Sequence, residues 1–500
     1  MARLAADVNP RGTARLEVNL ERHTPATRDS GDTPSDAGEC ENGFVEHISS
    51  PPFLFGLRAI TVSDTPQSTY LIDFTPTGGL VISVLNYSKL RHASLLGALI
   101  SALLASAGTL RAAPVIPPAG EPHLEPQISG SPGNGITIKP GDDFSLNLKG
   151  RIQLRYQLNV PPEVAGQRAT QQLVTVGTVR LNFSGIVLKP ELTYLIQLAL
   201  AGRDYRDGAT TPLYDAYFDW KAHRDFNLRV GQFLVPFDRL RTVKESALQM
   251  TDRPRPVQEL TLDRDVGAVL YSEKFLGQNS PVALRIGAFG GGGANQVSDK
   301  KPGALWVGRV EARPLGPIDD DSEGDLERRT KPGLALGVAV AKDWKSNRQK
   351  TTTGITFVGG TTSYTHAAMD LVFKWRGAAF EGAYLWKGAS KDRIFSVDEA
   401  GVQVVEATRA GSGWVLQASY VLDPPVEFAA RFSKMVAASG TDPAFVKEVA
   451  TKGEELGAGV NYYLNGHKLK LQTGWIGRMP AGLKLSQADH LASFLIDGTF

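Results

Sequence analysis

The longest regular pattern in the chain is a strict alternation of apolar and polar positions over the fifteen residues 144–158. A period of two residues predicts a β-strand, because successive side chains of a strand point to opposite faces. Strands in soluble proteins are usually about five or six residues long. A strand of this length, with Lys149, Arg151 and Arg155 on its polar face, therefore favours a tilted strand between lipid and a watery interior. The alternative is a long amphipathic strand of a soluble sandwich.

The same alternation recurs along the rest of the chain. It occurs at residues 179–187, 192–200, 216–220, 306–312, 369–375, 380–386, 414–420, 426–432 and 469–471. Aromatic side chains cluster near the ends of several of these faces, where outer-membrane barrels carry their interfacial girdles. Residues 494–500 alternate in the same way and end on Phe500, which is typical of a closing barrel strand.

Connections of two lengths separate these stretches. Short turns occur at residues 188–191, 423–425 and 464–467, and longer polar segments, expected as outer loops, occur at residues 159–172, 201–212, 238–263, 315–332, 343–362, 387–412 and 435–453. This asymmetry is typical of outer-membrane barrels. At about 22 residues per strand and connection, the chain from residue 140 onward holds about 16 strands. The predicted fold is all-β: a transmembrane antiparallel β-barrel over residues 141–500, with short periplasmic turns and long outer loops.

Residues 89–107 have the order of a secretory signal. A basic start at residues 89–92 is followed by ten apolar residues, 95–104, and by the small residues Ala105, Ser106 and Ala107. This order matches a cleavable signal peptide, and ten apolar residues are about half of what a membrane-spanning helix needs. The alternative is a buried helix. The signal predicts export, and with the barrel pattern it predicts the outer membrane.

The segment before this signal is unusual, because signal peptides belong at an N-terminus. Residues 1–88 are polar and aperiodic, and no methionine occurs between Met1 and Met250. We therefore expect translation to start at a non-AUG codon near residues 81–85, so that 1–88 is disordered or untranslated. After the signal, residues 108–140 contain seven prolines and are predicted to form a linker.

Composition and motifs narrow the function classes. The chain has 54 Lys and Arg against 52 Asp and Glu, a balance that argues against nucleic acid as a partner. No Walker-type phosphate loop, HExxH or CxxC motif is present, so neither a cofactor, nor a metal, nor enzyme activity is predicted. The glycine run at 290–293 and His467 in an Asn-Gly turn are predicted to be plain turn residues. Cys40 is the only cysteine and precedes the expected cleavage site, which is compatible with the periplasm and outer membrane.

Strand parity assigns the charged side chains that face the lumen, where width and field decide what passes. Eleven basic residues and six acidic residues fall on this face. The basic residues are Lys149, Arg151, Arg155, Arg180, Arg309, Arg313, Lys374, Arg376, Arg431, Lys468 and Lys470. A positive wall raises the local concentration of anions, and the first six residues are the pore-lining candidates. The alternative is that the bases pair with the acids and only keep the lumen wet.

Several stretches resemble the phosphate-selective porin family of the O and P type. They are residues 215–217 (DAY), 228–237 (LRVGQFLVPF), 264–267 (RDVG), 308–309 (GR) and 459–467 (GVNYYLNGH). The resemblance covers roughly residues 142–500. It implies a 16-stranded barrel, a homotrimer, passive diffusion of solutes, and an inward fold of the loop 238–263 that narrows the pore.

The implied constriction loop has a balanced charge. Its basic residues are Arg239, Arg241, Lys244, Arg253 and Arg255, and five acidic residues accompany them. These five bases are the constriction candidates, but their number alone does not predict selectivity.

Three functions remain open on the sequence. The first is a diffusion porin that prefers phosphate or similar small anions, and the second is a general porin with weak preference. The third is a secreted soluble β-protein, a carbohydrate-binding protein or a glycosidase in which Glu381 and Glu427 would pair. A porin implies membrane lipid, lipopolysaccharide, small anionic solutes and the barrel assembly machinery as partners.

Overall fold

The computed structural model describes residues 126–163, 166–205, 211–295, 303–423 and 425–500, together with the backbone of five short upstream strands. The chain divides into two units, Met1–Pro118 and Ala119–Phe500. In the first unit, β1 (Ala6–Val8) pairs with β2 (Ala14–Leu16), and β3 (Ile60–Thr65), β4 (Ser68–Phe74) and β5 (Leu80–Leu85) form a three-stranded antiparallel sheet. The signal expected at 89–107 lies outside the described residues. It stays a prediction, as does the expectation for 1–88.

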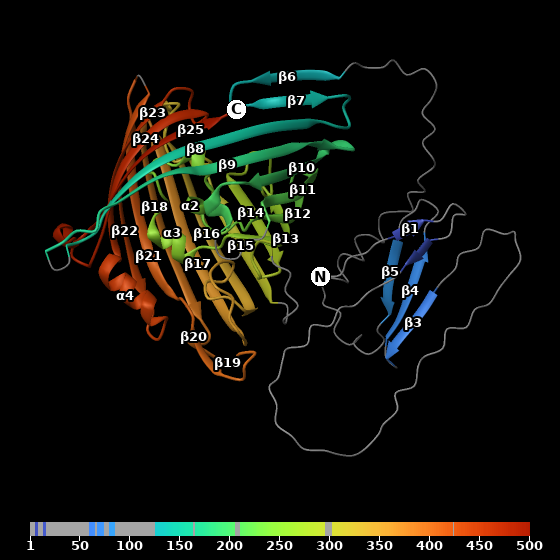
Figure 1. The fold of residues 1–500 in the computed structure, drawn as a ribbon. Coiled ribbons are helices and arrows are strands. Elements are labelled where there is room, and N and C mark those ends of the chain that lie inside the picture. The colour runs from blue at the N-terminus through green and yellow to red at the C-terminus, as the bar shows by residue number, and fades with distance from the viewer. Residues whose placement is uncertain are drawn as a thin grey trace, which may run out of the picture. The chain divides into compact units, whose positions relative to one another are not determined.

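Sixteen antiparallel strands of the described residues close into a barrel (Figure 1). The strands are β8 (Leu146–Val160), β9 (Gln171–Val187), β10 (Lys189–Ala199), β11 (Leu213–His223), β12 (Phe226–Leu234), β13 (Arg264–Ser272), β14 (Val282–Phe289), β15 (Ala304–Ala312), β16 (Gly333–Ser346), β17 (Thr362–Trp375), β18 (Ala378–Ala389), β21 (Gly411–Val421), β22 (Val426–Ala437), β23 (Glu454–Tyr463), β24 (Leu469–Met479) and β25 (Asp489–Thr499). Closure is made by β25 on β8, where Thr499 lies opposite Arg151. The predicted fold class is confirmed.

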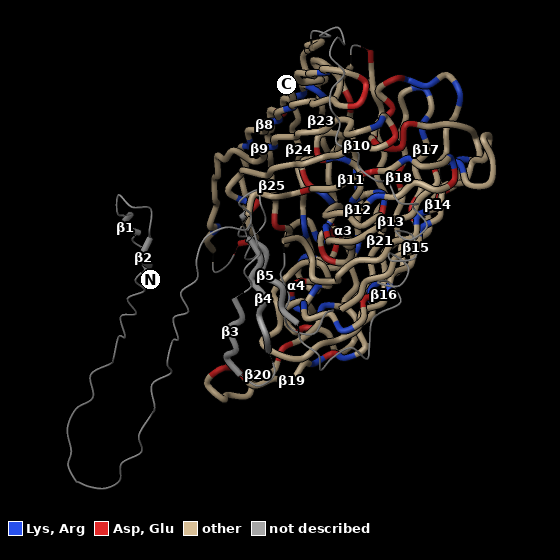
Figure 2. Tube along the Cα trace, turned by 90° about the vertical axis from the view of Figure 1, so that its right-hand side faces the viewer, with Lys and Arg blue, Asp and Glu red and all other residues tan. Residues whose placement is uncertain are grey.

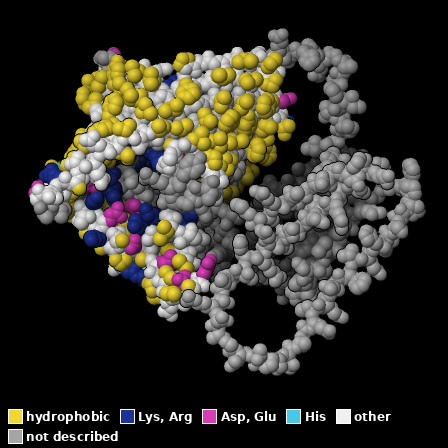
Figure 3. Space-filling model, viewed as in Figure 1, with side chains coloured by type: hydrophobic (Ala, Val, Ile, Leu, Met, Phe, Trp, Pro, Cys, Tyr) yellow, Lys and Arg dark blue, Asp and Glu magenta, His cyan; other side chains and the backbone are white. Residues whose placement is uncertain are grey.

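The two faces of the wall differ as the alternation predicts. On β8, Leu148 and Leu154 are 40% and 48% exposed, whereas Gln153 and Arg155 on the inward face are 3% and 8% exposed. Figure 3 shows hydrophobic side chains gathered over the barrel wall, and Figure 2 shows basic and acidic residues interspersed along strands and loops. None of the helices in the described part of the chain is long and apolar enough to cross a membrane.

A hairpin replaces part of the predicted linker. Strands β6 (Gln127–Ser131) and β7 (Gly135–Lys139) pair with each other, and β7 pairs with the start of β8. The linker prediction is therefore wrong for residues 127–139. The prolines that suggested it, Pro126, Pro132 and Pro140, stand before, between and after the two strands, where a missing backbone donor costs nothing.

One long connection lies at the opposite end from the others. Because strand direction alternates, residues 313–332, between β15 and β16, lie at the same end as the short turns. Length alone predicts an outer loop for 315–332, and that prediction is wrong, since length does not say at which end a connection lies. We call residues 313–332 the turn-end segment.

Residues 235–263, between β12 and β13, fold into the barrel, and we call them the inward loop. They contain α2 (Arg239–Thr242), η2 (Glu245–Ala247) and α3 (Arg255–Leu260). The Asp238 side chain caps α2 by accepting a hydrogen bond from Leu240 N (3.0 Å). The other short elements are η1 (Gly202–Tyr205), β19 (Arg393–Val397), β20 (Gln403–Ala407), α4 (Pro443–Lys452) and η3 (Leu485–Gln487).

The inward loop packs tightly against the wall formed by β16–β18 and β21–β24, which we call the filled side. Leu240, Val257 and Leu260 join a buried apolar cluster with Leu385 and Val415 of that wall. Glycines make room for the approach: a Cβ atom at Gly457 would lie 2.6 Å from Met250 Cε, and one at Gly413 would lie 2.8 Å from Pro256 Cβ. The loop therefore leaves the lumen open along β25 and β8–β15 and beside the turn between β23 and β24, which together we call the open side.

Candidate functional site: a cationic cavity in the lumen

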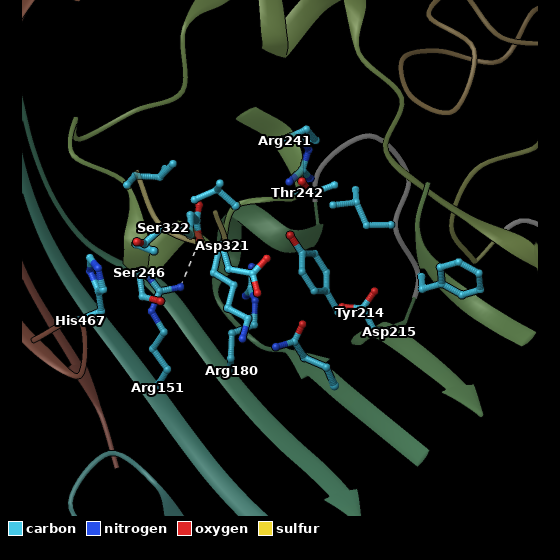
Figure 4. Close-up of a pocket in the computed structure, with 18 of the residues that line it drawn as sticks. Arg151, Arg180, Tyr214, Asp215, Arg241, Thr242, Ser246, Asp321, Ser322 and His467 are labelled. Atoms are coloured by element: carbon cyan, nitrogen blue, oxygen red, sulfur yellow. Dashed lines mark hydrogen bonds and ion pairs between the residues drawn. The ribbon is translucent and has the colours of Figure 1, made fainter. Parts of the chain in front are cut away.

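The open side of the lumen contains a water-accessible cavity of about 1160 Å³ between the inward loop and the strands β8–β15. Fourteen Lys and Arg residues line it, against eight Asp and Glu. In Figure 4, Arg180 extends from the wall toward Tyr214, Arg151 extends toward the inward loop at Ser246, and Arg241 belongs to the facing helix α2. No residue of β16–β18 or β21–β23 is among those that line this cavity.

The six pore-lining candidates all lie on this cavity. They are Lys149, Arg151, Arg155, Arg180, Arg309 and Arg313. Strand parity placed them on the correct face, but it does not say how many of them carry an uncompensated charge.

Five of these six candidates are neutralised by acids. Arg151 binds Asp497 through Nε (2.8 Å) and Nη2 (2.5 Å). Arg155 pairs with Asp252 (2.7 Å). An arginine whose donors are already bound to a carboxylate has fewer left for a passing solute.

The same holds for the other three arginines. The Arg180 guanidinium pairs with Asp204 (2.6 Å). Arg309 pairs with Asp370 (2.7 Å) and Glu311 (2.8 Å), and Arg313 pairs with Asp320 of the turn-end segment (3.0 Å). The pore-lining candidates are thus mostly members of ion pairs, and only Lys149 lacks an acidic partner among the described residues.

The five constriction candidates separate into two groups. Four of them, Arg239, Arg241, Lys244 and Arg253, line the cavity. Arg255 does not, because it points toward the loop end and pairs with Glu448 of α4 (2.5 Å). Its place among the constriction candidates is therefore corrected: α3 aims it at a neighbouring loop.

Most of the remaining loop bases are also engaged. Arg239 pairs with Asp320 (2.8 Å) and Asp370 (3.1 Å), and Arg241 pairs with Asp263 (2.6 Å). The guanidinium of Arg253 donates to the carbonyl oxygens of Leu240 and Val243. These bonds hold the loop in place.

Three lysines on the cavity have no acidic partner within the described residues: Lys149 of β8, Lys244 of the inward loop, and Lys468 of the turn between β23 and β24. They are close enough that the charges of Lys244 and Lys468 act on Lys149. Three ammonium groups from three separate parts of the chain therefore face the water of one cavity. Sequence reasoning named all three separately but gave no signal that a loop and a turn bring them together.

The pKa values of two acidic residues of the inward loop show how differently their surroundings act on a negative charge. Burial alone would raise the pKa of Glu245, but the nearby Arg203 and Arg151 hold it well below its usual range. Burial and the neighbouring Asp370 raise the pKa of Asp238 to about 6, against a hydrogen bond from Thr261 that lowers it. Glu245 is thus a fixed negative charge in a cationic surrounding, whereas Asp238 titrates in a dry one.

A β-bulge adds a residue that period-two reasoning misses. The pairing of β10 with β11 shifts so that Gln197 lies opposite Asp215 and Leu198 opposite Leu213, which leaves Tyr214 as the extra residue. Its ring lies under the guanidinium groups of Arg264 (3.6 Å) and Arg180 (4.3 Å). A bulge re-aims one side chain, and here it turns an even-numbered residue into the lumen.

Three inward lysines on the filled side serve as anchors. Lys374 Nζ donates to the carbonyl oxygens of Asp319 (2.7 Å) and Ser322 (2.8 Å). Lys387 and Lys470 donate to the carbonyl oxygens of Glu259 and Leu248, each at 2.6 Å. Lys374 and Lys470, which parity counted as lumen bases, therefore end on backbone oxygens.

The two glutamates of the glycosidase alternative do not line the cavity. Glu427 is buried and accepts hydrogen bonds from Gln249, Asn461 and Tyr463. Glu381 is 2% exposed, and no hydrogen bond reaches its carboxylate oxygens. A sugar in the cavity would reach neither group. Among the described residues, no group of three or more His, Cys, Asp or Glu is arranged to hold a metal.

A closed antiparallel barrel with an apolar outer wall and a charged lumen defines the class of outer-membrane porins. Within that class, a family model described as phosphate-selective porin O and P matches residues 146–481. The match covers well over half of the chain, and the chain belongs to this family.

Solved structures give weaker likenesses. An anion-selective porin from Comamonas acidovorans is 13% identical, with 71% of this chain and 100% of that chain covered and a TM-score of 0.44. OmpF of Salmonella typhi in complex with daunomycin is 12% identical, with 72% and 98% covered and a TM-score of 0.46. The outer membrane channel DcaP of Acinetobacter baumannii is 13% identical, with 71% and 97% covered and a TM-score of 0.44. No conclusion on this chain rests on them, and no curated protein matches it.

Proposed function

We propose that this porin lets small solutes diffuse passively through the outer membrane and prefers anions, phosphate or similar oxyanions among them. The observation that carries the proposal is the group of three lysines, Lys149, Lys244 and Lys468, without acidic partners on a cavity that basic residues dominate. Unpaired ammonium groups keep their donors for a solute, and a positive wall raises the local concentration of anions.

The test is the reversal potential of single channels in a salt gradient. Replacing the three lysines by glutamine (K149Q, K244Q and K468Q in one chain) removes three positive charges while keeping side chains of similar length. We expect the reversal potential to move toward cation preference, most strongly at low salt, where fields are screened least. The matched control is K274Q, K447Q and K484Q, three exposed lysines away from the cavity. If the triple variant K149Q, K244Q and K468Q kept the anion preference of the wild type, the proposal would be wrong.

The second candidate is a general porin with weak preference. The observation in its favour is that arginines on the cavity are largely paired with acids, as Arg151, Arg155 and Arg180 are. A wild-type channel with a reversal potential near zero in the same gradient would favour this candidate.

Assembly and export are part of the same proposal. We expect a homotrimer, export through the signal at 89–107, insertion by the barrel assembly machinery, and contact with lipid and lipopolysaccharide. Family membership and the apolar outer wall support these expectations. Crosslinking in native outer membranes and N-terminal sequencing of the mature chain test them separately.

A further inference from the structure

The inward loop is tied to the filled side through one residue, Gln249, which is 1% exposed. Its side-chain amide donates from Nε2 to Ser419 Oγ (2.5 Å) and to Glu427 Oε1 (2.8 Å). Its Oε1 accepts from Gln417 Nε2 (2.8 Å). Each polar atom of this side chain is therefore used on β21 or β22.

The backbone around Gln249 is held just as firmly. Its carbonyl oxygen accepts from Asn461 Nδ2 (2.9 Å) and Gln472 Nε2 (2.7 Å). The preceding carbonyl, of Leu248, accepts from Lys470 Nζ (2.6 Å). Four consecutive strands, β21–β24, thus hold two neighbouring residues of the loop.

The turn-end segment reaches the same residue from the opposite end of the barrel. Glu323 Oε2 accepts hydrogen bonds from Gln249 N (2.6 Å) and from Gln417 Nε2 (2.8 Å). The backbone N–H of Glu323 donates to Ala247 O (3.4 Å). Two segments that enter the barrel from different ends therefore meet at one glutamine, and together they cover the filled side.

We propose that Gln249 is the positioning residue that joins the inward loop and the turn-end segment into one partition of the lumen, and so sets the width of the permeation path. This inference rests on the proposed function as a diffusion channel. Gln249 contacts no solute. It acts through the loop that carries Lys244, because a loop released from the wall moves this lysine away from Lys149 and Lys468.

The chain offers a test by repulsion and rescue. Gln249→Glu puts a carboxylate where an amide donates to Glu427 Oε1, so that two acids face each other in a dry site. Adding Glu427→Gln returns a donor at that position, while its other oxygen still accepts from Asn461 and Tyr463. The matched control is Gln278→Glu, which changes an exposed glutamine away from the cavity.

The measurements are single-channel conductance and reversal potential in planar bilayers. We expect Gln249→Glu to raise conductance roughly twofold, because a loop released from β21–β24 obstructs less of the lumen, and to lower anion preference. The double variant should return both values toward wild type, and Gln278→Glu should leave them unchanged. A stability role alone would lower the yield of folded barrels without changing the conductance of those that insert.

A second variant covers the case in which Gln249→Glu does not fold. Gln249→Ser removes the side-chain bonds without adding a charge, and we expect a smaller increase of conductance in the same direction. Wild-type conductance and reversal potential in a folded Gln249→Glu or Gln249→Ser channel would overturn the inference. Absence of any channel in the wild-type protein would instead overturn the proposed function.

Discussion

The open side and the filled side of the lumen both present charged residues on the inward faces of their strands, yet the water-accessible cavity lies on the open side. On the open side, bases pair with acids around a cavity and three lysines keep their charges free. On the filled side, Lys374, Lys387 and Lys470 end on carbonyl oxygens of segments that cover them. A charged side chain on the inward face of a strand can therefore act on solutes only where no other segment of the chain binds it.

Lys468, in the turn before β24, and Lys470, in β24 itself, allow the most direct comparison of a free lysine with a bound one. Lys470→Glu reverses a fully buried charge that holds Leu248, close to Glu427 and Asp497. Breaking such a buried contact costs about 3–5 kcal/mol, so we expect a large loss of folded barrel. Heat-modifiable migration on detergent gels measures it. Lys468→Glu, two residues away on the cavity, should fold normally and shift only the reversal potential. Equal folding of both variants would break the distinction between the two sides.

Apolar packing of the inward loop offers a second contrast. Met250 is 1% exposed and lies against Gly457 and Gly459. Met250→Ala should lower the free energy of unfolding by about 2–5 kcal/mol, the usual cost of a large-to-small change in a dry core. Ser246→Ala, on the cavity, should change it by less than about 0.5 kcal/mol. Urea unfolding in detergent compares the two, and a similar cost for both would show that the filled side is not dry.

The pH dependence of stability tests whether Asp238 of the inward loop lies in a dry surrounding, as the filled side predicts. Asp238 has a folded-state pKa of about 6, above its usual 3.8, so between these values the folded state binds more protons than the unfolded state. Stability should therefore fall as pH rises from about 4 to 6, by on the order of 1–3 kcal/mol. Unfolding midpoints across this range give the slope. Asp238→Asn should flatten it; an identical slope in that variant would assign the effect to another group.

The smallest expected effect concerns a neutral pair. Arg155→Gln together with Asp252→Asn removes one positive and one negative charge that lie 2.7 Å apart. Because opposite charges this close nearly cancel at the distance of a solute, the reversal potential should stay within error of the wild type. Lys149→Gln alone should move it. A shift in the pair variant as large as that of Lys149→Gln would show that paired arginines also attract solutes.

Local patterns predicted the fold, because the period of two residues is a property of each strand by itself. The same parity placed Lys468 and Lys470 together among the lumen bases, although one is free and the other is an anchor. Their difference depends on the carbonyl of Leu248, which a distant loop brings to Lys470. Tyr214 was missed because a bulge breaks parity, and the turn-end segment was misplaced because connection length does not report direction. The sequence patterns did not predict the paths of the inward loop and the turn-end segment inside the barrel.

The hairpin β6–β7 has a consequence for how the barrel closes. Strands β25 and β7 use the same edge of β8 in succession: Phe500 exchanges hydrogen bonds with Gly150, and Ile136 of β7 lies opposite Leu148. The rungs beyond Gly150 are already occupied, so β25 has no room to slide further along β8. A slip of one residue would turn every lipid-facing side chain of β25 inward. The hairpin thus limits how far β25 can extend along β8 and so fixes the register of the pairing that closes the barrel.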